Sequence, residues 1–94
     1  MDLAALKASL QDKAPPAGLA PLVEALWHEA NGDWDRAHRI AQDIPDADGS
    51  WVHAYLHRVE GDLGNAGYWY RRAGKPRCEA PLKQEWDEIA SALL

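Results

Sequence analysis

The sequence lacks several features that would point to particular protein classes. It has a single cysteine, Cys78, so no intrachain disulfide and no cysteine-rich zinc site can form. No apolar run approaches about 18 residues, which a membrane-spanning helix needs. The segment from Met1 to Ala14 also lacks the long apolar stretch of a secretion signal. We therefore expect a cytoplasmic protein that has no membrane partner.

Positive charge is also scarce in this chain. Ten Lys and Arg residues stand against fifteen Asp and Glu residues, which gives a net charge of −5. Because nucleic acids and anionic membrane surfaces attract basic proteins, we expect neither as a partner. Apolar residues make up 47% of the chain and charged residues 27%. This composition suits one folded domain over residues 1–94.

Phenylalanine is absent, whereas the chain has five tryptophans and three tyrosines. Each of these large rings can bury roughly 150–250 Å². They can supply the core of a small domain, or alternatively the interface of a homodimer.

The spacing of apolar residues predicts an all-α fold, because no alternating β pattern of useful length is present. Prolines, glycines and capping aspartates mark the helix ends. Asp33 and Asp62 are expected to cap two of the helices, and Asp48 or Ser50 a third. About six helices are predicted, over residues 2–13, 21–30, 34–44, 50–60, 63–73 and 81–94.

An internal repeat indicates how these helices are arranged. Residues 25–44 align with residues 54–73 at an offset of 29, and five positions are then identical. Two of the identities form a Gly-Asp pair, in which glycine ends one helix and aspartate caps the next. Stacked helical hairpins are expected from a repeat of this size. The identical pairs are Ala25/Ala54, His28/His57, Gly32/Gly61, Asp33/Asp62 and Ala37/Ala66.

This pattern resembles the tetratricopeptide repeat, a helical hairpin with a Gly-Asp-aromatic turn and spaced small and large residues. The second copy carries the resemblance most fully, in Ala54, Gly61, Asp62, Ala66, Tyr70, Ala73 and Pro76. The repeat length of 29 departs from the roughly 34 residues usual in that family. The resemblance implies two hairpins, over about 21–45 and 50–76, flanked by capping helices at 2–13 and 81–94. The string from Trp51 to Gly74 is also similar to small uncharacterised bacterial proteins, which implies no activity.

The tetratricopeptide resemblance implies a concave surface made by the first helix of each hairpin. A protein or peptide segment, or a second copy of the chain, could bind there, because Trp, Tyr and Arg are frequent in binding hot spots. Alternatively, the helix at 81–94 or the N-terminal helix covers this surface and the aromatic residues belong to the core. The positions implied are Leu22, Leu26, Glu29, Trp51, Tyr55 and Arg58.

The histidines offer a second candidate site. His53 and His57 share a helix face at spacing i, i+4, and Glu60 lies one turn further on. His28 is the repeat partner of His57, so the set could hold zinc or another divalent ion, or move a proton. The alternative is structural, since the resemblance places His28 and His57 where the family has an inward-facing aromatic residue. The HExxH zinc motif is absent.

Four cations, Arg71, Arg72, Lys75 and Arg77, form a third candidate within seven residues. Guanidinium groups bind phosphates and carboxylates in pairs. Alternatively, these cations only oppose the dipole at a helix C-terminus.

No catalytic or cofactor-binding motif is found, so the sequence favours a small protein-interaction module without a cofactor. The alternative function is a metal-binding or anion-binding protein or enzyme, which would use the His28, His53 and His57 set with Arg71 and Arg72.

Overall fold

The computed structural model describes residues 1–94 and contains helices and loops, with no strand. The expected all-α fold with six helices is confirmed. None of the helices is long and apolar enough to cross a membrane. The helices are α1 (Leu3–Ser9), α2 (Pro21–Ala30), α3 (Trp34–Gln42), α4 (Ala47–Val59), α5 (Leu63–Ala73) and α6 (Leu82–Leu93).

The turns between α2 and α3 and between α4 and α5 have matching geometry. Gly32 and Gly61 both have positive φ, at 86° and 84°, which side-chain-bearing residues rarely adopt. The N–H groups of Asp33 and Asp62 each donate to a carbonyl five residues earlier, at 2.9 Å. Both aspartate side chains then accept an N–H from three residues later, at 3.2 Å. The two Gly-Asp pairs therefore end one helix and begin the next in the same way.

The C-terminal ends of two helices differ by two or more residues from those expected from the sequence. The first helix ends at Ser9, whereas Lys13 was expected. Beyond Ser9 the chain tightens into i→i+3 hydrogen bonds, such as Asp12 N–H to Ser9 C=O at 2.9 Å, before it reaches Pro15. The third helix ends at Gln42, two residues earlier than expected.

Helix α4 begins at Ala47, three residues earlier than expected, and its capping residue differs as well. Asp46 accepts the N–H of Gly49 at 2.8 Å, whereas Asp48 or Ser50 was expected to cap this helix. Asp46 directly follows Pro45 and has the extended backbone of a capping residue. Ser50 is instead buried within the helix.

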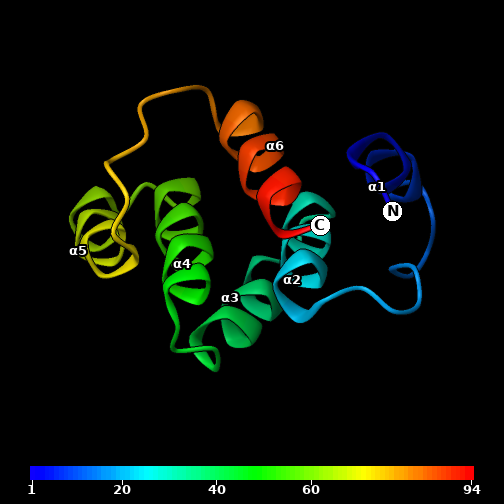
Figure 1. Cartoon of the computed structure of the whole chain (residues 1–94), viewed down its shortest axis with the longest axis horizontal. Coiled ribbons are helices and arrows are strands. Elements are labelled where there is room, and N and C mark those ends of the chain that lie inside the picture. The colour runs from blue at the N-terminus through cyan, green and yellow to red at the C-terminus, as the bar shows by residue number, and fades with distance from the viewer.

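The arrangement of the helices places α5 and α1 at opposite ends of the molecule, as Figure 1 shows. Helix α6 lies between them, where it packs against α4 and α2 and also touches α1. The core is formed where α2, α4 and α6 meet, and Leu26, Leu56 and Ile89 are completely buried there.

Three tryptophans form hydrogen bonds from one helix to another. Each indole N–H donates to an oxygen on another helix, so the ring buries apolar surface while its polar group stays satisfied. The bonds are Trp27 to Ser9 Oγ at 3.2 Å, Trp34 to Leu56 C=O at 2.7 Å and Trp86 to Leu26 C=O at 3.0 Å.

Equal effects are predicted for Gly32→Ala and Gly61→Ala. A Cβ at either position meets no neighbouring atom, so the cost arises only from the left-handed backbone. Each variant should lose about 1 to 2 kcal/mol of unfolding free energy in urea denaturation. Gly64→Ala is the control, because Gly64 lies in exposed helix and alanine there should stabilise by up to about 1 kcal/mol. A Gly32→Ala or Gly61→Ala variant more stable than the native chain would contradict the turn geometry.

Candidate functional site

Helix α6 covers much of the face predicted to bind a partner, as expected in the alternative in which the helix at 81–94 lies over it. Leu22 and Leu26 are buried in the core with residues of α6. The Arg58 guanidinium donates to the buried carboxylate of Glu85 at 2.9 Å and also bonds the carbonyl of Ala80. In this structure Leu22, Leu26 and Arg58 contact α6 or the segment before it. Partner binding by these residues stays a prediction.

Glu29 and Tyr55, from the same predicted set, line a pocket that α6 leaves open. The pocket has a volume of about 570 Å³ and lies where α1, α2, α4 and α6 meet. Its apolar walls include Leu10, Leu82 and Trp86. The full lining is Lys7, Leu10, Glu29, Ala30, Tyr55, Leu82, Lys83, Trp86 and Asp87.

The Glu29 carboxylate is poorly satisfied in this pocket. Its only hydrogen bonds come from the Tyr55 hydroxyl, which lies 3.4 Å from both carboxylate oxygens. Burial raises the pKa of Glu29 above its ordinary value of 4.5, although the Tyr55 hydrogen bond partly opposes the shift. Lys7 does not compensate Glu29, because its ammonium is paired with Asp87 at 3.0 Å.

Trp51, the remaining residue of the predicted face, lies away from this pocket. The ring is half-buried, and the ammonium of Lys75 lies 4.2 Å from its centre. This cation–π contact occupies the face of the ring, so Trp51 and Lys75 form a pair of their own.

A second cluster brings together three histidines from α3 and α4. His53 and His57, as the i, i+4 spacing indicated, lie on one face of α4, with ring centres 4.8 Å apart. The third member is His38 of α3, whose Nε2 lies 3.0 Å from Nε2 of His53. One ring nitrogen from each histidine lies within 4.8 Å of the others.

His28 lies outside this cluster. Its ring is edge-on to Trp27, with centres 5.3 Å apart, and its Nε2 is buried without a hydrogen-bond partner. The metal-binding set expected from the sequence therefore differs from the observed group, in which His38 takes the place of His28. Glu60 approaches the cluster through His57, whose Nδ1 lies 2.7 Å from Glu60 Oε1.

Electrostatics keep two of these histidines neutral near pH 7. Burial, with further repulsion from His38, His57 and Arg72, lowers the pKa of His53 to about 4. Burial and the neighbouring His57 likewise lower the pKa of His38 from its ordinary value. A neutral imidazole keeps a nitrogen lone pair, which is the form that binds a metal ion.

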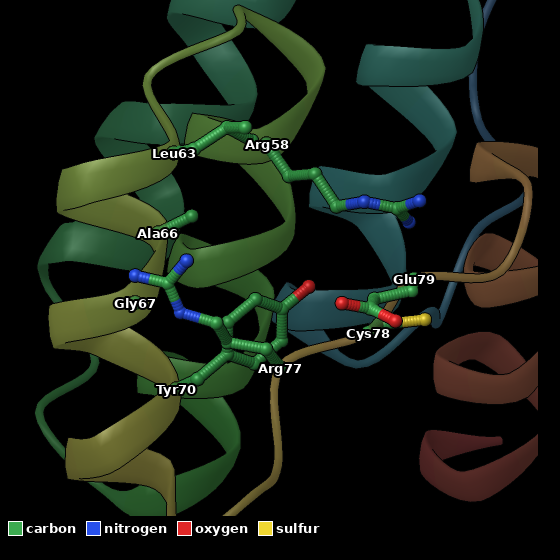
Figure 2. Close-up of a pocket in the computed structure, with 8 residues that line it drawn as sticks. All are labelled: Arg58, Leu63, Ala66, Gly67, Tyr70, Arg77, Cys78 and Glu79. Atoms are coloured by element: carbon green, nitrogen blue, oxygen red, sulfur yellow. The ribbon is translucent and has the colours of Figure 1, made fainter.

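The four predicted anion-binding cations make different contacts in the structure. Arg71 is exposed, and Arg72 lies 4.9 Å from the ring centre of Trp69. Arg77 extends over α5 beside Gly67 and lines a smaller pocket of about 220 Å³ (Figure 2). Figure 2 also shows that the guanidinium of Arg58 lies on the opposite side of this pocket from that of Arg77. Anion binding by these cations stays a prediction.

Sequence reasoning missed two residues that matter here, His38 and Glu85. Glu85 is only 1% exposed and bonds both Arg58 and Tyr70. The position of Glu85 in the sequence could have indicated its burial. Glu85 follows Leu82 by three residues and precedes Ile89 by four, and this helical spacing places it on the apolar face of α6. His38 directly follows Ala37, a buried small residue of the repeat, and is itself half-buried.

Comparison with known families, curated proteins and solved structures gives no match to this chain.

Replacing Glu29 with glutamine should stabilise the protein at neutral pH. Because the folded-state pKa of Glu29 is raised, the free energy of unfolding falls as pH rises through the interval above 4.5. Glu29→Gln removes this loss and still accepts the Tyr55 hydrogen bond. Urea denaturation should show the variant gaining stability at neutral pH and gaining less below pH 4.5. Glu88→Gln, at an exposed position of α6, is the control. A gain that does not change with pH would contradict the assigned burial of Glu29.

Proposed function

We propose that this protein is a small interaction module of the tetratricopeptide-like kind, which binds a partner segment carrying a basic side chain between apolar ones. The binding site is the pocket where α1, α2, α4 and α6 meet. The partner would place its cation against Glu29 and its apolar neighbours against Leu10, Leu82 and Trp86. This proposal keeps Glu29 and Tyr55 of the predicted concave surface and adds residues of α1 and α6.

The observation that carries the proposal is the half-buried Glu29 carboxylate, whose only hydrogen bonds are two long ones from Tyr55. A carboxylate removed from water is unfavourable unless it is paired or hydrogen-bonded. An arriving guanidinium or ammonium would supply the missing donors and form a charge-assisted hydrogen bond. The same burial raises the pKa of Glu29.

The pocket's size and the charge of the chain support the same occupant. A volume of about 570 Å³ is within the range of roughly 300–1,000 Å³ typical of ligand pockets. Leu82 is an exposed large apolar residue at its wall. The net charge of −5 attracts basic partners over longer distances. Lys83 is exposed at the pocket, where water and salt screen its repulsion.

A peptide titration followed by NMR tests this proposal. The probes are N-acetylated, C-amidated Ala-Leu-X-Leu-Ala peptides, in which X is Arg, Gln or Glu. The Arg peptide should shift the amide signals of Ala30 and Leu82 and the indole signal of Trp86 at millimolar concentration. Glu29→Gln should weaken this binding at least about tenfold, since it removes a charge-assisted bond. Glu88→Gln, the matched control, should bind like the native chain.

Two results would overturn the proposal. The first is equal binding of the Arg, Gln and Glu peptides, because the pocket would then have no preference for a cation. The second is a set of shifts that depends on protein concentration without peptide and maps to this pocket. That result would assign the pocket to a second copy of the chain.

A further inference from the structure

We propose that His38, His53 and His57 form a binding site for one divalent transition-metal ion, with zinc the first candidate. The site joins α3 of the first hairpin to α4 of the second. It is separate from the pocket around Glu29 and does not depend on the partner-binding proposal.

The spacing of the three rings suits a common ligand. The ring centres are 4.6 Å apart for His38 and His53, 4.8 Å for His53 and His57, and 5.4 Å for His38 and His57. Zinc–nitrogen bonds of about 2.1 Å in tetrahedral geometry place imidazole centres roughly 5 Å apart. The same geometry places ligand nitrogens about 3.4 Å apart. The Nε2 atoms of His38 and His53, at 3.0 Å, need to separate by only a few tenths of an ångström.

Glu60 prepares His57 to act as a ligand. Its Oε1 lies 2.7 Å from Nδ1 of His57, so this nitrogen carries the hydrogen and donates it. The lone pair of a neutral His57 is then on Nε2, which is free to bind an ion. Carboxylates commonly orient metal-binding histidines through the second ring nitrogen in this way. Glu60 therefore acts as a positioning residue, whereas it was predicted from the sequence to be one of the metal ligands.

Tryptophans hold two of the ligand rings in place. Trp34 stacks on His38 with an interplanar angle of 11°, and its own N–H is fixed by the carbonyl of Leu56. Trp69 stacks on His53 at 3.8 Å and 13°. Because these rings are already oriented, binding an ion would cost little conformational entropy.

A hydrogen bond between neutral histidines is the competing explanation. A single hydrogen between the Nε2 atoms of His38 and His53 would account for their 3.0 Å separation without an ion. It would not account for the third ring, nor for the carboxylate that directs the second nitrogen of that ring. Three imidazole ligands also match zinc sites that leave the fourth position to water or another small ligand. Imidazole equally suits copper, nickel and cobalt, so the test uses more than one ion.

Metal titration of the tag-free chain tests this inference. Isothermal titration should show one Zn²⁺ per chain, and Co²⁺ should give the visible absorption of a tetrahedral site. His38→Gln and His57→Gln should each abolish binding or weaken it by more than Glu60→Gln, which should cost about 10-fold to 100-fold in affinity. His28→Gln is the matched control, because His28 is buried but lies outside the cluster.

A second measurement keeps the test valid if a buried variant does not fold. In NMR spectra of the native chain, Zn²⁺ should shift the ring signals of His38, His53 and His57 and leave those of His28 in place. Zn²⁺ should also raise the melting temperature, whereas Mg²⁺ should not, because only an ion bound to the folded state stabilises it.

Three outcomes would overturn the inference. They are no binding of Zn²⁺ or Co²⁺ by the native chain, binding of undiminished affinity in a folded His38→Gln variant, and one ion shared by two chains. His38 is only half-buried, so its replacement is the variant least disruptive to packing. If binding fails while the peptide titration succeeds, only the metal site is rejected.

Discussion

The buried carboxylate of Glu85 is the constraint on which the rest of the structure depends. It accepts hydrogen bonds from Arg58 at 2.9 Å and from the Tyr70 hydroxyl at 2.6 Å, and so joins α6 to both helices of the second hairpin. A buried charge is tolerated only when it is paired and bonded, so α6 cannot shift along α4 without leaving Glu85 unsatisfied. Burial raises the pKa of Tyr70, with Glu85 adding to the shift, and the hydroxyl therefore remains a donor. The position of α6 determines which part of the surface formed by α2 and α4 is covered and which part remains open as the pocket beside Glu29.

The excess of tryptophan over phenylalanine follows from how these helices are joined. An indole N–H can reach an oxygen on a neighbouring helix while the ring fills the core, and a phenyl ring offers no such donor. Trp86 uses this bond to fix α6 to α2, and Trp34 uses it to fix α3 to α4. Trp34 also stacks on His38, so the same ring helps to shape the histidine cluster. Packing and site geometry therefore share residues in this small protein.

Local sequence signals predicted the helices well and the contacts between them less well. Gly32 and Gly61, each followed by a capping aspartate, mark the two turns correctly, because positive φ and side-chain capping are properties of a few adjacent residues. The offset of 29 paired His28 with His57, yet the cluster is completed by His38. Which side chain meets α4 depends on how α3 is rotated against it, and periodicity does not encode that rotation. The packing of α6 over α2 and α4 likewise depends on contacts between residues far apart in the sequence. The sequence left it open as one of two alternatives, and the position of Glu85 on an apolar stripe is a local sign of it.

Native-state hydrogen exchange of α6 tests most directly whether Glu85 fixes this helix to the hairpins. The amides of Ile89 and Ala90 should exchange with the same free energy as those of Val52 and Leu56 in α4, because α6 should open only when the whole chain unfolds. Exchange in α6 at a much lower free energy, while α4 stays protected, would contradict this account. It would show that α6 separates from α2 and α4 while the hairpins remain folded.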